Sequence, residues 1–261
     1  MPEFTSYAHG TPCWVDVTSP GLDQTIEFYK GLFGWEAEAT QPDAGGYTMF
    51  TLRDKYVAAG SPPQEDTTTS YWTTYLASDD VDDTAKKIRD AGGTVFMDPF
   101  DVFDSGRMTI AQDPTGAVFG VWQAKEHLGA QLANEPGTFL WNQCQTSDPA
   151  RATAFYQAVF GYEVDEIDLG GEQAFRALKV NGRGIAGVRE PTSAGQPPHW
   201  STVFAVADTD ETVARAKELG GTVLMEPFDL PEIGRLAVIQ DPQGAVFQTM
   251  KSTGPPLEPP A

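Results

Sequence analysis

The sequence is poor in histidine and cysteine, the residues that most often bind transition metals or act as nucleophiles. Of its 261 residues, three are histidine and two are cysteine. Cys13 and Cys144 occupy different positions of the internal repeat described below, so neither a disulfide framework nor a Cys-x-x-Cys metal site is indicated. His9 precedes the first predicted strand and His127 lies in a linker, and both are expected to be solvated.

Basic residues are also scarce. The chain has 17 lysines and arginines against 37 aspartates and glutamates, a net charge of −20. This negative field disfavours nucleic acids and anionic membranes as partners. No apolar run approaches the roughly 18 residues of a membrane span, and the first residues lack the basic and apolar regions of a signal peptide. A cytoplasmic protein is therefore expected.

A repeated block dominates the chain. Residues 93–122 and 221–250 are identical at 16 of 30 positions. Each copy contains Asp-Pro-x-Gly between two apolar runs, a pattern typical of a type I turn joining two strands. The repeat extends across the chain, with Pro-rich loops absorbing the length differences, and it predicts two domains. The predicted boundaries are a first domain at 8–124, a linker at 125–134, a second domain at 135–251 and a disordered tail at 252–261.

Each copy predicts the same order of elements. A strand is followed by a helix that contains Phe28-Tyr29 or Phe155-Tyr156 and ends at a glycine. More strands, a second helix that starts at Asp80 or Asp208, and the repeated block follow. The predicted fold is α+β, with a strand–helix–strands unit used four times.

This order resembles the vicinal oxygen chelate superfamily, which includes glyoxalase I, bleomycin-resistance proteins and extradiol dioxygenases. The resemblance rests on FYKGLFGWE (28–36), FYQAVFGYE (155–163), DPTG, DPQG and the tandem βαβββ plan. The sequence is most similar to two-domain actinobacterial glyoxalase-like proteins, some labelled as hydroxylases. The resemblance implies four βαβββ modules whose sheets curve into two ligand-holding cups.

The family's metal ligands map onto residues that do not suit a divalent metal. The first-strand position is Trp14 or Trp141, and the position on the next module's first strand is Thr73 or Ser201. The closing carboxylate position is Gly120 or Gln248. Because metals of this class require imidazole or carboxylate ligands, we expect neither a metal nor another cofactor.

Strand alternation predicts which side chains line each cup. Trp72 and Trp200 are expected to point into the helix layer instead. The candidate ligand-binding residues are Trp14, Thr73, Tyr75, Gly120 and Trp122 in the first cup and Trp141, Gln143, Ser201 and Gln248 in the second.

Two residues are candidate catalysts. Asp16 is the acid expected in the first cup, where apolar walls would raise its pKa and suit it to act as a general base. His199 could act as an acid or base in the second cup. Each has a structural alternative, which is a hydrogen-bonded strand residue for Asp16 and an exposed residue at a loop end for His199. Trp14 and Trp141 could stack an aromatic ligand or fill the space of a lost metal site.

Three functional hypotheses are compatible with the sequence. The first is a metal-free protein that binds a small hydrophobic, aromatic metabolite in a resistance or biosynthetic accessory role. The second is a cofactor-independent hydroxylase, isomerase or lyase acting on an aromatic or polyketide-like substrate. The third is an interaction protein with filled cups. Arg107 and Arg235 are expected to pair with Asp101 and Asp229, or to bind a ligand carboxylate. A monomer and a homodimer are both compatible with the sequence.

Overall fold

The computed structural model describes residues 3–39, 45–64, 68–167, 175–191 and 195–254, which form two β-sheets and four helices. The first sheet is built from residues 12–124 and the second from residues 139–252. The predicted α+β fold of four modules is confirmed. In the described part of the chain, no helix is both long and apolar enough to cross a bilayer. The predicted tail falls mostly on 255–261, outside the described residues.

The first sheet has nine strands in the order β2-β3-β4-β1-β5-β9-β8-β6, with β7 also paired to β8. Its two halves are the two modules, which meet where β1 and β5 run antiparallel. The strands are β1 (Pro12–Thr18), β2 (Glu36–Ala37), β3 (Thr48–Leu52), β4 (Lys55–Ser61), β5 (Tyr71–Ala77), β6 (Thr94–Val95), β7 (Phe100–Val102), β8 (Gly106–Gln112) and β9 (Val118–Ala124).

The second sheet has eight strands in the matching order β11-β12-β13-β10-β14-β17-β16-β15. The central antiparallel pair is β10 with β14. The strands are β10 (Phe139–Gln145), β11 (Glu163–Ile167), β12 (Phe175–Val180), β13 (Arg183–Arg189), β14 (His199–Ala205), β15 (Thr222–Leu230), β16 (Gly234–Gln240) and β17 (Val246–Ser252). The short strands β2 and β11 complete the βαβββ plan of their modules.

Local sequence signals explain most helix ends. Asp80, Asp148 and Asp208 are N-caps whose carboxylates accept backbone N–H bonds, and Gly34 and Gly161 end their helices in the left-handed conformation. The helices are α1 (Leu22–Phe33), α2 (Val81–Asp90), α3 (Pro149–Phe160) and α4 (Thr209–Glu218). The start of α1 is an exception, because this helix begins after Gly21 without a side-chain cap.

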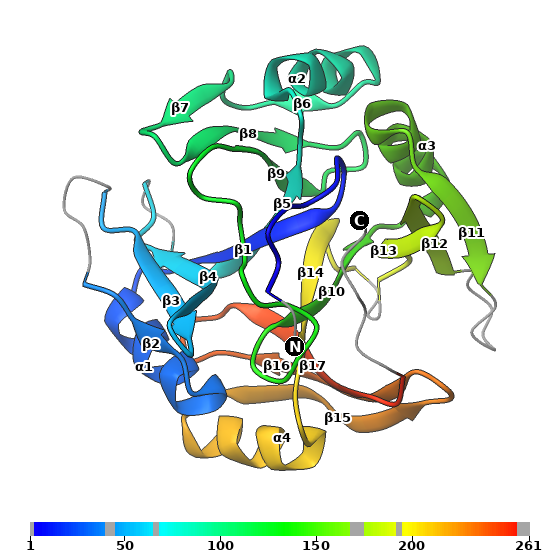
Figure 1. Ribbon diagram of the computed structural model, residues 1–261. Coiled ribbons are helices and arrows are strands. Elements are labelled where there is room, and N and C mark those ends of the chain that lie inside the picture. The colour runs from blue at the N-terminus through cyan, green and yellow to red at the C-terminus, as the bar shows by residue number, and fades with distance from the viewer. Residues whose placement is uncertain (1–2, 40–44, 65–67, 168–174, 192–194, 255–261) are drawn as a thin grey trace.

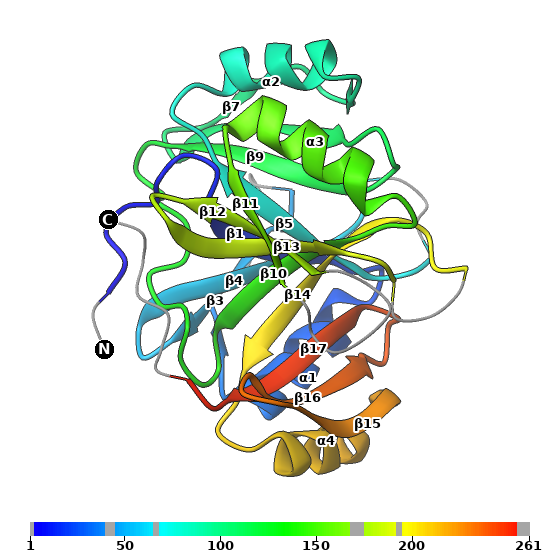
Figure 2. The same cartoon turned by 90° about the vertical axis from the view of Figure 1, so that its right-hand side faces the viewer.

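The helices pair across the domain boundary. In both views, α2 lies beside α3 at one end of the molecule, and α1 lies beside α4 at the other (Figures 1 and 2). Phe155 and Tyr156 of α3 pack on Phe119 of the first sheet, while Phe28 and Tyr29 of α1 pack on Phe247 of the second. Each domain therefore contributes one helix to the other domain's core.

A buried hydrogen-bonded chain fixes this exchange at one end. The hydroxyl of Tyr156 donates to Asp113 Oδ2 at 3.0 Å and accepts from Trp200 Nε1 at 2.7 Å. Asp113 belongs to the DPTG turn of the other domain, and its Oδ1 accepts from the backbone N–H groups of Thr115, Gly116 and Ala117. One carboxylate thus shapes the turn and holds the opposite domain's helix.

The same chain recurs at the other end. Tyr29 donates to Asp241 Oδ2 at 3.1 Å and accepts from Trp72 Nε1 at 2.9 Å. Trp72 and Trp200 therefore point into the helix layer, as predicted. The two most conspicuous repeated motifs, Phe-Tyr and Asp-Pro-x-Gly, are partners in the interface between the two repeats, far from the inner faces of the sheets.

Candidate ligand-binding site

The inner face of the first sheet, called here the first cup, is defined by the strand register. Asp16 pairs with Thr73 across β1 and β5, and Trp14 pairs with Tyr75. Tyr75 is aligned with Gly120 on β9, and Gly120 with Ile110 on β8. Since paired residues point to the same face, these six residues form two adjacent rows across the middle of the cup.

A polar cluster lies on the β1 side of the first cup. Asp16 is buried, and its Oδ2 accepts hydrogen bonds from Tyr75 at 2.9 Å and from Tyr47 at 3.1 Å. The Tyr47 hydroxyl in turn accepts from Trp14 Nε1 at 2.8 Å. Burial raises the pKa of Asp16 to about 6, although bonds from Tyr75, Tyr47 and Thr73 oppose the shift. The carboxyl can therefore accept or release a proton near neutral pH.

Tyr75 lies over the position of the family's closing carboxylate. A Cβ atom on Gly120 would stand 2.1 Å from Tyr75 Cδ1, so any larger side chain would displace the Tyr75 ring. The glycine thus makes room for a tyrosine whose hydroxyl reaches Asp16. Where the resemblance implies a carboxylate, the first cup holds an aromatic ring and a hydroxyl donor.

The linker packs over the first cup beside Trp14. His127 packs edge-on against Trp14, with ring centroids 4.6 Å apart, and also contacts Trp122 and Tyr56. Trp122 Nε1 donates to the His127 carbonyl at 2.9 Å. The expectation of a solvated His127 was wrong, since burial lowers its pKa to about 4 and leaves its Nε2 without a hydrogen-bond partner. His9 is half-buried as well.

The second-module half of the first cup exposes apolar side chains. Val118 lies two residues before Gly120 on β9, so it points to the same face, and it is 40% exposed. Phe96, at the edge of the sheet, donates its backbone N–H to Ile110 and is 54% exposed, while Phe100 is 40% exposed. Large apolar side chains gathered at the surface mark a contact site for a ligand or partner.

The inner face of the second sheet, the second cup, carries neutral polar groups. Gln248 Nε2 donates to Ser201 Oγ at 2.9 Å, and Gln143 Nε2 approaches Gln248 Oε1 at 3.5 Å. Half-buried Trp141 lies near Phe175, with centroids 6.4 Å apart. An apolar cluster that includes Val203, Leu236, Val238 and Met250 fills the other half.

The two catalytic candidates are in different settings. Asp16 is enclosed by donors in the first cup, whereas His199 begins β14 at the rim of the second, where its Nδ1 lies 2.9 Å from the Pro197 carbonyl. The structure brings Trp14, Asp16, Thr73 and Tyr75 together, with Gly120 and Trp122 on the same face. It also brings Gln143, Ser201 and Gln248 together. Sequence reasoning missed Tyr47 and His127, because both lie outside the strands whose alternation gave the candidates.

The side chains in both cups fit a divalent metal poorly. The mapped positions offer indole, hydroxyl, amide and no side chain at all, and Asp16 is already held by two phenols. Throughout the described ranges, no three His, Cys, Asp or Glu residues are grouped as metal ligands would be. The mapped positions therefore supply none of the imidazole and carboxylate groups that such ions require.

The two arginines that recur in the repeat form ion pairs at the surface. Arg235 bonds Asp229 at 3.0 Å and forks onto Asp210 at the start of α4. Arg107 forks onto Asp82 in the same way, and Asp101 lies 3.6 Å away. The expected pairing with Asp101 and Asp229 is present, and each arginine also ties its hairpin to a helix.

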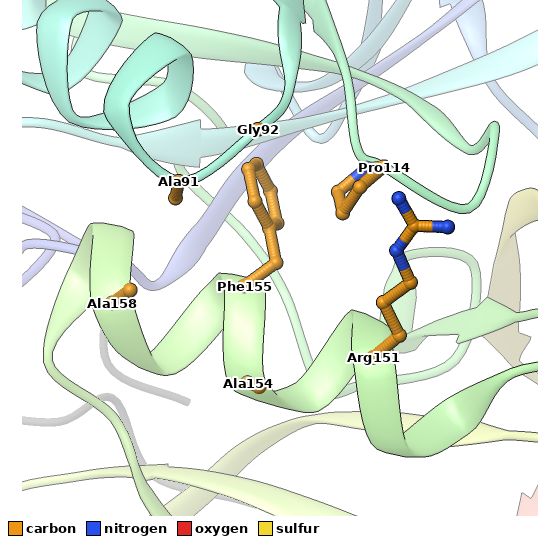
Figure 3. A pocket seen from close by; sticks show the side chains of 7 residues that line it. All are labelled: Ala91, Gly92, Pro114, Arg151, Ala154, Phe155 and Ala158. Carbon is orange, nitrogen blue, oxygen red and sulfur yellow. The ribbon is translucent and has the colours of Figure 1, made fainter.

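A shallow hollow of about 250 Å³ lies on the helix side of the molecule (Figure 3). Buried Phe155 points from α3 toward Gly92, and Pro114 and Arg151 line the hollow beside it. At the matching place in the other helix pair, Leu219 packs against Gly31. The hollow exists because Ala91, at the end of α2, is smaller than Leu219 at the matching position of α4. Arg151 is the one charged residue that lines it, and the other lining residues are apolar.

Comparison with known proteins places this architecture in a family. The chain is 43% identical to "Putative glyoxylase CFP32" of Mycobacterium bovis, over 96% of this chain and 98% of that protein. It is 39% identical to "Anthracycline biosynthesis protein DauV" of Streptomyces sp. (strain C5), over 95% of both. Its fold is similar to the Mn(II)-bound glyoxalase of Novosphingobium aromaticivorans, with a TM-score of 0.67, 18% identity, and coverage of 93% of this chain and 82% of that one. The family model for the Glyoxalase/Bleomycin resistance protein/Dioxygenase superfamily matches residues 13–121 and 127–249, and the chain belongs to this superfamily.

Proposed function

We propose that the protein binds a small aromatic metabolite in its first cup, and that it does so without a metal. The observation that carries the proposal is the exposed apolar wall around Val118, Phe96 and Phe100, on the same inner face as the buried Asp16–Tyr75 pair. An apolar surface with a few convergent polar groups is the usual composition of a small-molecule site. The likeness to a protein named for anthracycline biosynthesis supports an aromatic ligand.

The first cup supports this role better than the second. In the second cup, the residue that matches Val118 is half-buried Val246, and the side chains of one half form their own apolar cluster. Asp16 is replaced there by Gln143, an amide already close to Gln248. The first cup combines exposed apolar area with a titratable group, and this combination offers both affinity and orientation.

An enzyme acting on the same ligand is the second candidate, and the raised pKa of Asp16 favours it. A carboxylate with a pKa of about 6 can take a proton from a bound hydroxyl or an acidic carbon at neutral pH. Such an isomerase or lyase would convert the ligand, whereas a binding protein would release it unchanged. Mass spectrometry of the ligand recovered after incubation separates the two.

A charge placed in the apolar wall is expected to abolish binding. We predict that Val118→Glu weakens the affinity for the probe 2-naphthol at least about tenfold, because an ionised carboxylate resists burial against an aromatic ring. The matched variant Val246→Glu adds the same charge in the second cup and should leave the affinity unchanged. Isothermal titration calorimetry measures both. Equal losses in the two variants, or a loss confined to Val246→Glu, would contradict the placement of the site.

A further inference from the structure

Tyr47 lies in the first cup in the manner of a bound phenol. It precedes β3, is half-buried, and brings its hydroxyl between two groups of β1. That hydroxyl accepts from Trp14 Nε1 at 2.8 Å and donates to Asp16 Oδ2 at 3.1 Å. The strands themselves therefore supply one donor and one acceptor, and a hydroxyl group is what satisfies both.

Other groups fit these two atoms less well. A carbonyl oxygen could accept from the Trp14 indole but has no proton for Asp16. An ammonium could donate to Asp16 but cannot accept from the indole, and a second carboxylate would add negative charge beside a buried acid in a chain of net charge −20. A phenol also brings a flat ring, which suits the surrounding aromatic side chains.

Tyr47 lies just outside the regular strands of the sheet. Trp14, Asp16 and Tyr75 are fixed by the β1–β5 register, while Tyr47 lies outside β3 and is the most exposed member of the cluster. Tyr47 can therefore leave without breaking a strand pairing. Tyr75, which bonds the same oxygen of Asp16, would stay and keep the carboxyl in position.

We infer that the first cup recognises a hydroxylated aromatic ring, whose hydroxyl takes the place of the Tyr47 hydroxyl between Trp14 Nε1 and Asp16 Oδ2. This inference rests on the proposed function and specifies its ligand class. The rest of the ligand extends from Asp16 over Thr73 to Val118, a span of two strand spacings or about 10 Å. Such a span suits a fused ring system better than a single ring.

Removal of the Tyr47 side chain should create a site for its own analogue. Tyr47→Ala is expected to bind p-cresol at least about tenfold more tightly than 4-methylanisole, which keeps the acceptor oxygen but carries a methyl group in place of the donor proton. Millimolar p-cresol should also raise the melting temperature of this variant. The matched control is Tyr71→Ala, since Tyr71 is a 49% exposed tyrosine on the rim of the same sheet. We expect p-cresol to leave the melting temperature of Tyr71→Ala unchanged. In Tyr47→Ala combined with Asp16→Ala, the preference for p-cresol should disappear.

The outcomes separate this inference from the proposed function. If Tyr47→Ala binds the two probes equally while the unmodified chain binds 2-naphthol, the hydroxyl subsite is wrong and the aromatic site stands. If p-cresol is preferred but the unmodified chain does not bind 2-naphthol, the subsite stands and the proposed function is wrong. Rescue of Tyr71→Ala by p-cresol would show a nonspecific effect and overturn the inference.

Discussion

Replacement of Asp113 by alanine is expected to lower the free energy of unfolding by about 3–5 kcal/mol. The carboxylate accepts three backbone N–H groups of its own turn and the hydroxyl of Tyr156 from the other domain. Its loss leaves several buried donors unpaired, and each unpaired donor costs about 1–3 kcal/mol. Urea denaturation followed by fluorescence measures the change.

Two further variants test whether Asp113→Ala loses stability because the hydrogen-bonded link between the two domains is broken. Asp241→Ala removes the equivalent carboxylate at the other helix pair and should cost a similar amount. Asp101→Ala removes an exposed aspartate that bonds Lys125, and it should cost less than about 1 kcal/mol. Equal effects of Asp113→Ala and Asp101→Ala would show that the buried chain contributes little to stability.

The stability of the protein is expected to fall as the pH rises through the pKa of Asp16. Burial raises that pKa from an ordinary value of 3.8 to about 6, so the folded state binds the proton more tightly than the unfolded state. Protonated Asp16 therefore makes its full contribution to the free energy of unfolding below pH 4, and this contribution is lost as the pH rises through about 6. A shift of about two units corresponds to about 3 kcal/mol.

Asp16→Asn isolates this contribution from the general effect of the acidic surface. The amide does not titrate, and it can still accept the hydroxyls of Tyr47 and Tyr75. The unfolding free energy of the unmodified chain minus that of the variant should decrease by up to about 3 kcal/mol between pH 4 and pH 7. Denaturation curves at several pH values give this difference. A difference that stays constant, or increases with pH, would mean that Asp16 is not a buried acid with a raised pKa.

Much of the fold could be predicted because the chain repeats itself. Two copies with the same turns, helix ends and apolar periods fix the order of elements, and the family resemblance fixes how they combine. The packing of each domain's first helix on the other domain's sheet could not be predicted in this way. Tyr29 and Asp241 are 212 residues apart, and nothing local to either motif indicates that they bond.

Only those residues of the candidate site that lie on strands could be predicted, because the prediction used the alternation of side chains along a strand. Trp14, Asp16, Thr73 and Tyr75 share a face because period-two geometry requires it. Tyr47 and His127 approach the same cup from a loop end and from the linker, where no period applies. Their positions depend on how the connections fold back over the sheet, which is a tertiary property.

The first cup is proposed to bind an aromatic ligand directly through its side chains. The most direct test is calorimetric titration of 2-naphthol into protein treated with EDTA and dialysed, compared with the same protein after addition of Mn²⁺. We predict one site per chain and the same affinity in both preparations. Binding that is lost after EDTA treatment and returns with Mn²⁺ would contradict the account.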